Sequence, residues 1–391
     1  MPTWTQATPA SAGVRPGTYI NFAAAALENI APGALGVVAV AGIQNWGPDG
    51  DVQSLASLAE AKALFQDTDD ATSTLYRMVR EAFLGGANRV LAYRMMGASG
   101  AAKSVRTLQD TTGSPVNVIR LNSKYYGTYG NAFKVSVADN ISDATLTDIK
   151  LYNGSTLLRT WTSTVAQGDS GYIDDLVAQI NADTGNIWIT ATKLAAGNET
   201  LADLSSTSFS SGNDGASITS TEHAAAMDAF ALEDFNIVAF ETTNSGIMAS
   251  VQAWVADLRD NNDKHVICIL GSGTGDEVAD ATATAQDLNH EGIVYLYPGL
   301  TMPNVAGTLT NYAGSRVTAR VAGMLAGLAL SGSLTFAPVA GATNVETRLI
   351  DSDVRLLEAA GVCVLTWNGT QVVIDRGLTT LSSPGSKPAD F

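Results

Sequence analysis

The stretch GVVAVAG, residues 36–42, decides the fold class. It is a continuous apolar strand, and comparable strands recur at FNIVAF (residues 235–240), HVICIL (residues 265–270) and GIVYLYP (residues 292–298). Helical patterns separate these strands. Continuous apolar strands that alternate with helices indicate a sheet covered on both faces. The sequence therefore predicts an α/β core domain.

The segments around these strands supply the predicted helices. Two helices near residues 54–65 and 72–84 precede a strand at NRVLAYR, residues 88–94. A long helix of small residues is predicted at residues 316–330, where Gly323 and Gly327 permit close packing. A short charged helix at residues 351–360 leads into the strand pair GVCVLTW and TQVVID.

Residues 97–222 differ in composition from the segments around them, because they are rich in Thr, Ser, Asn, Asp and Gly. Phe133, Val135 and Val137 share one face of an alternating strand, and Asn153-Gly154 predicts a hairpin turn in which both residues have positive φ. One amphipathic helix carries Ile173, Leu176, Val177 and Ile180 at helical spacing. We predict an inserted antiparallel β-rich domain.

The predicted organisation has four parts. Residues 1–32 form an extended N-terminal arm, and residues 33–96 the first part of the core. The β-rich domain at residues 97–222 interrupts this discontinuous core, and residues 223–391 form its second part.

The arm contains Pro2, Pro9, Pro16 and Pro32 and one short possible strand, GTYINFA. Such a segment cannot bury enough apolar area by itself to offset its ordering entropy. We expect Tyr19, Ile20 and Phe22 to contact a sheet edge on a neighbouring subunit, through backbone hydrogen bonds. The alternatives are a disordered tail and an arm folded back on its own domain.

Charge excludes several partners. The net charge of −16 repels DNA, RNA and anionic membranes, so we expect no nucleic acid and no membrane as partners. The N-terminus lacks the pattern of a secretory signal, and the most apolar segment, residues 317–330, is shorter than the ~20 residues that a membrane span needs. Charged residues make up only 15% of the chain, which fits either large subunit contacts or a surface rich in Ser, Thr and Asn.

Residues that could carry chemistry are scattered. His223, His265 and His290 lack partners at the spacing of a metal site, so we expect solvated or capping roles for them. Cys268 and Cys363 lie in apolar strands and are expected to be inert core thiols. We therefore predict no catalytic residues, no metal and no cofactor.

Two glycine-rich segments are candidates for phosphate loops. GASGAAKS, residues 97–104, lacks the adjacent Gly-Lys-Ser/Thr that such a loop needs. GSGTGDE, residues 271–277, follows a strand and precedes a helix, but Asp276 and Glu277 place negative charge where a phosphate would bind. Acidic residues are favoured at a helix start in any case, so we expect a helix cap.

Several segments, in order along the chain, resemble the tail sheath family of contractile bacteriophages and tailocins. The segment RPGTYINF (residues 15–22) resembles the arm motif, and GVVAVAGIQNWGP (residues 36–48) the first core strand and turn. The remaining similar segments are EAFLGGANRVLAYR (residues 81–94), SKYYGTYGNAFKVSV (residues 123–137), SSGNDG (residues 210–215), RVAGMLAGLALSGSLTFAPVAGA (residues 320–342) and LLEAAGVCVLTWNGTQVVIDRGLTTL (residues 356–381).

The resemblance also predicts one difference. In the family, the segment that GLTTL resembles is followed by a basic strand and a long C-terminal stretch that helps to link subunits. This sequence ends at Phe391, so we expect it to lack that extension, as a truncated form, a processed product or a variant.

The resemblance implies a structural subunit and not an enzyme. Copies of the subunit would stack as rings around a tail tube and contract to drive the tube through the bacterial envelope. Its partners would be copies of itself, the tail tube protein, and the baseplate and tail terminator proteins, in a virion tail assembled in the host cytoplasm. The family places a C-terminal helix against the tube, which implies that Asp353, Arg355 and Glu358 face it.

Two other classes of protein remain as alternatives. One is an α/β nucleotide-binding enzyme that uses GSGTGDE, and the other is a β-rich surface-binding module built on residues 97–222.

Overall fold

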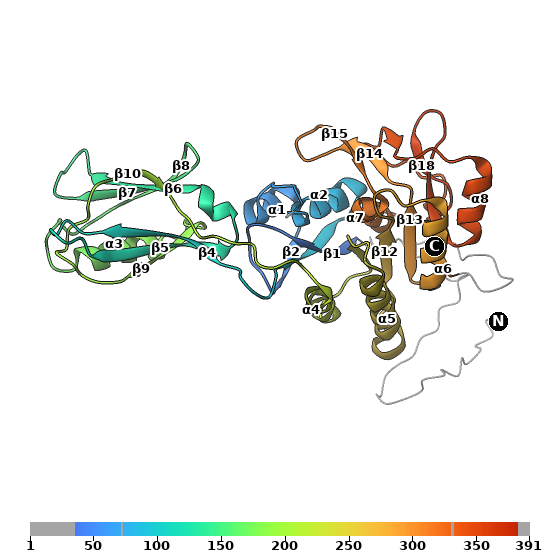
Figure 1. The fold of residues 1–391 in the computed structure, drawn as a ribbon, viewed down its shortest axis with the longest axis horizontal. Helices are drawn as coiled ribbons and strands as arrows, with labels where there is room; N and C mark the ends of the chain where they lie inside the picture. The colour runs from blue at the N-terminus through green and yellow to red at the C-terminus, as the bar shows by residue number, and fades with distance from the viewer. Residues whose placement is uncertain (1–35, 72, 330–331, 382–391) are drawn as a thin grey trace, which may run out of the picture.

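The computed structural model describes residues 36–71, 73–329 and 332–381. The predicted arm, with Tyr19, Ile20 and Phe22, lies outside the described residues. The described chain forms two lobes of unequal size joined by a narrower waist (Figure 1). The larger lobe contains the segments on either side of an insertion, and the smaller lobe contains most of the residues that were predicted to form it.

The larger lobe is built on one eight-stranded sheet. Its six central strands run parallel, and an antiparallel strand closes each edge. In spatial order the strands are β18 (Val372–Ile374), β17 (Val362–Trp367), β13 (Ile293–Tyr297), β12 (Ile267–Gly271), β11 (Ile237–Phe240), β1 (Val37–Ile43), β3 (Arg89–Met95) and β2 (Val52–Leu55).

Strands β1 and β11 are the neighbours that join the two separate core segments. Val38 pairs with Ile237 and Ala41 with Phe240, although an inserted domain separates the two strands in sequence. The prediction of one discontinuous α/β core is thereby confirmed.

Helices cover both faces of this sheet (Figure 1). One face packs against α1 (Leu58–Phe65), α2 (Leu75–Gly85) and α7 (Gly314–Ala326). The other face packs against α4 (Ser220–Ala231), α5 (Ser245–Asn262), α6 (Val278–Leu288) and α8 (Asp351–Ala359). Each face has its own buried apolar cluster, which explains why the core strands are apolar on both sides.

Helices α2 and α7 approach closely because glycines lie between them. A Cβ added to Gly323 would lie 2.1 Å from the Ala82 carbonyl oxygen, and one added to Gly85 would lie 2.4 Å from the Arg320 carbonyl oxygen. The predicted close packing at Gly323 is confirmed. The predicted end of this helix at residue 330 is wrong, because Gly327 is its C-cap.

A small three-stranded sheet lies beside the α2–α7 face and was not predicted from the sequence. It contains β15 (Leu309–Tyr312), β14 (Leu300–Pro303) and β16 (Asn344–Val345). These strands are only two to four residues long, so their periodicity is too short to identify them in the sequence.

The smaller lobe is an antiparallel β domain with one helix. Its first sheet contains β10 (Leu204–Ser208), β6 (Phe133–Asp139), β7 (Thr147–Asn153) and β8 (Thr156–Thr162). The second contains β4 (Lys103–Gln109), β5 (Asn117–Tyr126) and β9 (Ile189–Lys193), with α3 (Tyr172–Ala182) packed nearby. The predicted inward faces of β6 and α3 do enter a shared apolar core.

The hairpin between β7 and β8 is present, but its turn lies one residue later than predicted. Asn153 pairs with Thr156, so Gly154 and Ser155 are the turn residues. Gly154 has φ of 61°, and Asn153 is still part of the strand. A two-residue turn with glycine at its first position needs positive φ there, which Gly154 provides.

Candidate interaction surface

Helix α8 carries the three charged residues that were predicted to face the tail tube. It begins after Ile350, which has extended backbone and gives no side-chain cap. Asp351 and Asp353 lie in its first turn, where negative charge is favoured by the helix dipole. Leu357 is fully buried and Val354 partly buried against the sheet cluster, whereas Arg355 and Leu356 are exposed.

The predicted residues do not share one face of this helix. Arg355 and Glu358 line a groove between α8 and the β17–β18 hairpin, whereas Asp353 lines a second hollow between α8 and the start of α6. The first hollow, here called the α8 groove, has a volume of about 520 Å³. Helical spacing explains the split, because residues 351, 355 and 358 recur on one side of the helix and residue 353 does not.

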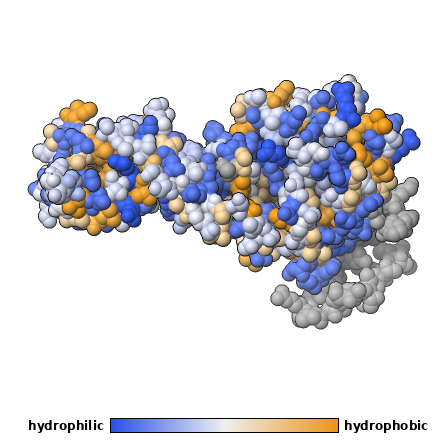
Figure 2. All heavy atoms as spheres, in the orientation of Figure 1, coloured by the Kyte–Doolittle hydropathy of each residue, from blue (hydrophilic) through white to orange (hydrophobic). Residues whose placement is uncertain are grey.

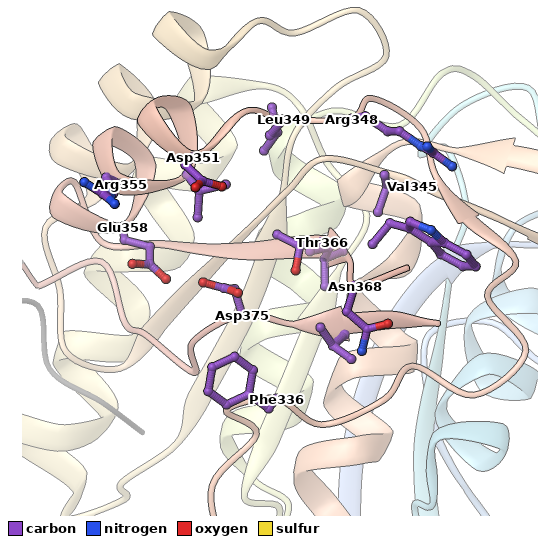
Figure 3. Close-up of a pocket in the computed structure, with 14 residues that line it drawn as sticks. Phe336, Val345, Arg348, Leu349, Asp351, Arg355, Glu358, Thr366, Asn368 and Asp375 are labelled. Atoms are coloured by element: carbon purple, nitrogen blue, oxygen red, sulfur yellow. The ribbon is translucent and has the colours of Figure 1, made fainter. Parts of the chain in front are cut away.

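Carboxylates dominate the α8 groove. Asp351 and Glu358 project from the helix, and Asp375 lies opposite them at the end of β18 (Figure 3). At the far end of the groove, the Arg348 guanidinium lies 6.0 Å from the centre of the Trp367 ring. The groove therefore offers charge of both signs near α8, where Arg355 lies with the two carboxylates, and a cation over an aromatic face near β17.

Apolar side chains are exposed on the same surface. Ile350 is 66% exposed and Leu356 is 53% exposed, and both belong to α8 or its start. Phe336, which lines the α8 groove, is 68% exposed. Figure 2 shows an apolar area at this end of the larger lobe. Exposed apolar side chains among charges are typical of a protein-contact surface.

A second place to consider is the crevice at the ends of β1 and β11. The strand order reverses there, which is where ligands bind in open α/β sheets. The Arg77 guanidinium donates to Asp69 Oδ1 at 3.0 Å and to Glu241 Oε2 at 2.6 Å. Arg316 Nε donates to the other Glu241 oxygen at 3.0 Å. The charges that line this crevice are thus paired with one another.

Arg77 is the buried centre of this ion-pair cluster. Burial by itself lowers the pKa of Arg77, but Glu241 and Asp69 outweigh it, so the pKa lies above its usual value. Tyr312 lies beneath both guanidinium groups, with its ring centre 5.5 Å from Arg77 and 5.8 Å from Arg316. The ion pairs in this crevice therefore link Arg77 of the first core segment to Glu241 of the second.

The GSGTGDE segment caps a helix, as predicted. The Gly273 N–H donates to Asp276 Oδ2 at 2.6 Å, and the Glu277 N–H donates to Asp280 Oδ2 at 2.9 Å. Both carboxylates satisfy backbone donors of the loop and of the start of α6. The acidic residues therefore occupy the positions from which a phosphate would accept hydrogen bonds.

Hydrogen bonds hold two of the histidine side chains in place, and both cysteine side chains are buried. His223 Nδ1 lies 2.9 Å from the Thr219 carbonyl oxygen, and His290 Nδ1 accepts from the Gly292 N–H at 3.0 Å. Cys268 and Cys363 are both fully buried and unbonded, and burial raises the pKa of the Cys363 thiol to about 12. In the described part of the chain, no cluster of three or more His, Cys, Asp or Glu side chains could hold a metal.

No helix within the described ranges is both long and apolar enough to cross a membrane.

The structure thus combines an α/β core with an inserted antiparallel β domain. Two family models match this chain, the phage tail sheath protein central domain over residues 216–380 and the phage tail sheath protein beta-sandwich domain over residues 98–214. The chain belongs to the phage tail sheath protein family, which is structural and not enzymatic.

Relatives match most of the chain. The uncharacterized protein YqbK of Bacillus subtilis strain 168 is 25% identical over 382 residues, which is 96% of this chain and 75% of YqbK. The phage-like element PBSX protein XkdK of the same organism is 26% identical, over 86% of this chain and 66% of XkdK. A sheath tail protein from Desulfitobacterium hafniense, 22% identical, has the same fold with a TM-score of 0.71, over 95% of this chain and 77% of that protein.

Proposed function

We propose that this sheath subunit assembles with copies of itself as stacked rings around a tail tube, and that the sheath contracts to drive the tube through a bacterial envelope. The observation that carries the proposal is family membership over both lobes, from residue 98 to residue 380. Contraction would draw its energy from subunit interfaces that are better in the contracted state than in the extended one. Such a transition needs no nucleotide, which agrees with the paired charges around Arg77 and Glu241.

Helix α8 is the surface that we propose to face the tube. Its exposed Ile350 and Leu356 can be desolvated by a partner, while Asp353 and Arg355 beside them can fix the register of the contact. Because Asp353 and Arg355 point to different hollows, the proposed contact spans the width of α8 and is not confined to one groove.

The N-terminal arm is the element that we propose to link subunits, through Tyr19, Ile20 and Phe22. A receiving sheet edge must have backbone groups without a partner. The two edges of the core sheet differ in this respect. The Phe336 N–H donates to the Ile374 carbonyl at 2.8 Å and so covers the β18 edge, whereas no described strand pairs with the outer side of β2. The β2 edge of a neighbouring subunit is therefore our choice for the arm.

The remaining partners follow from the position of a sheath in the particle. A polymer of this subunit has two ends, and we propose that a baseplate protein contacts one and a tail terminator protein the other. Assembly would take place in the cytoplasm of the bacterial host, and the finished sheath would be part of the virion tail.

Co-sedimentation with the tube protein of the same particle tests this function. We expect the wild-type chain to pellet with preformed tubes, and the double reversal of Asp353→Arg with Arg355→Asp to remain in the supernatant while keeping the wild-type circular dichroism spectrum. The matched control reverses the exposed pair Lys62 and Asp67 on the far side of the lobe, and it should pellet normally. Equal pelleting by all three proteins would exclude α8 as the tube contact.

A further inference from the structure

One tryptophan of the core segment lies inside the inserted domain. Trp46 follows β1 in sequence, yet it is 1% exposed and belongs to the apolar core of the β domain. Its ring centre lies 5.2 Å from that of Tyr125, 5.3 Å from those of Tyr129 and Phe133, and 6.1 Å from that of Trp188. Burial of an aromatic ring against several other aromatic rings stabilises the fold, both through the apolar area that it buries and through the ring pairs.

Arg94 holds the loop that presents Trp46. It lies in β3, immediately before the inserted domain, and its side chain is fully buried. Its Nε donates to the Gln44 carbonyl at 2.7 Å and its Nη1 to the Gly47 carbonyl at 2.6 Å, so the two bonds flank Trp46. Its Nη2 donates to the Tyr126 carbonyl of the inserted domain at 3.0 Å. One guanidinium thus joins three backbone segments.

Arg94 remains a cation while it makes these bonds. Burial lowers the pKa of Arg94 to about 10, partly offset by Asp49 and Asp214. At neutral pH the group is therefore charged. Charge-assisted donors to carbonyls are stronger than neutral ones, and removing this one would leave the buried Gln44 and Gly47 carbonyls and the part-buried Tyr126 carbonyl without it.

The two chain connections at the waist are also fixed to each other. Ala102 and Asn213 exchange backbone hydrogen bonds at 3.0 Å, and the Ala216 N–H donates to the Ser99 carbonyl at 2.8 Å. A two-stranded ribbon of this kind is only marginally stable by itself and can twist or bend. The paired connections alone would therefore act as a hinge.

We infer that Trp46 and Arg94 lock the orientation of the inserted β domain on the α/β core, so that the sheath subunit moves as one body. Trp46 places a core residue into the interior of the other lobe, and Arg94 prevents its loop from withdrawing. A force applied to the β domain is then transmitted to the core and is not absorbed at the waist. Both are positioning residues for the domain, and neither contacts a partner in this role.

Distance measurements between spin labels on the two lobes test the lock in the full chain. Ser155→Cys lies in the exposed β7–β8 turn and Ala253→Cys on the exposed side of α5, and both native cysteines are fully buried. We expect a narrow distance distribution in the otherwise wild-type protein. Trp46→Leu should broaden the distribution at least twofold, and Trp46→Phe should restore most of its sharpness.

Trp161→Leu is the matched control, because Trp161 is buried in the same β-domain core but belongs to β8. It should lower the thermal stability of the β domain while leaving the distance distribution narrow. A folded Trp46→Leu protein with the wild-type distribution would overturn the inference. If Trp46→Leu does not fold, Arg94→Lys decides, because lysine cannot reach three carbonyls: a broadened distribution supports the lock, and an unchanged one overturns it.

Discussion

Arg77 Nη2 lies 2.6 Å from Glu241 Oε2, and this contact joins α2 of the first core segment to the end of β11 in the second. Arg77 is 1% exposed at its side chain and Glu241 is 16% exposed. The two residues are separated by the whole inserted domain in sequence. The pair therefore holds together the two halves of a discontinuous domain.

Replacing Arg77 by methionine should destabilise the core strongly. The substitution removes the cation that pairs with Asp69 and leaves Glu241 paired with Arg316 alone, and breaking a buried pair costs about 3–5 kcal/mol. Urea unfolding followed by fluorescence measures the loss. Lys62→Met is the control, because the Lys62–Asp67 pair is exposed and should contribute less than about 1 kcal/mol. Equal effects of the two substitutions would mean that the buried network does not hold the core segments together.

Two glycines of α7 should respond differently to alanine. A Cβ at Gly323 would lie 2.1 Å from the Ala82 carbonyl oxygen, whereas one at Gly327 would lie 3.3 Å from the Gly86 carbonyl oxygen. Gly323→Ala must push α2 and α7 apart and should cost about 3 kcal/mol, the upper end of the usual range for overpacking. Gly327→Ala should stay within about 1 kcal/mol of the wild type. Thermal melts of the two variants measure this difference in stability. A similar loss of stability in both variants would contradict the prediction.

In acid, the inserted domain should lose the stabilisation that the Asp110 carboxylate provides. The Asp110 carboxylate accepts from the Val116 N–H at 2.7 Å and also from the Thr112 hydroxyl and the Asn198 N–H, so its pKa lies below the ordinary value of 3.8. A lowered pKa stabilises the fold fully above pH 3.8, and the stabilisation is lost as the pH falls through the lowered value.

Asp110→Asn removes this dependence. We expect its melting temperature to lie below that of the wild type at pH 7, and the difference to shrink as the pH is lowered below 3.8. Calorimetry at pH 7, 5 and 3 provides the comparison. A difference that stays constant over this range would show that the Asp110 charge is not involved.

Removal of the arm should change assembly and not folding. A protein that lacks residues 1–32 retains every strand and helix of the described structure, so its circular dichroism spectrum should match that of the full chain. If Tyr19, Ile20 and Phe22 link subunits, sedimentation velocity should show a shift from oligomers toward monomer. Rings or tubes of unchanged size from the shortened protein would exclude strand donation by this arm.

The sequence indicated the parts of this fold that depend on local pattern. The apolar core strands, the inward faces of β6 and α3, and the glycines of α7 all followed from residue spacing. The turn after β7 was placed one residue early, because Asn-Gly and Gly-Ser turns differ only in strand register.

Residue spacing does not reveal contacts between segments that are far apart in the sequence. Trp46 belongs to the segment that resembles the first core strand and turn, but nothing around it indicates that its ring lies in another domain. Arg77, Arg94 and Glu241 were not singled out either, since a buried arginine and an exposed one look alike in a sequence. For α8 the charges were identified, whereas their division between two hollows depends on how Leu357 anchors the helix. The domain boundaries at residues 97 and 222 and the tube-facing role of α8 stay predictions.

Electron cryomicroscopy of the full chain with the tube protein of the same particle tests the sheath function most directly. We predict rings stacked around the tube, with α8 on the inner wall and the β domain held in one orientation relative to the core. Particles that contain only single subunits, or a tube with no ordered density for this chain around it, would contradict it.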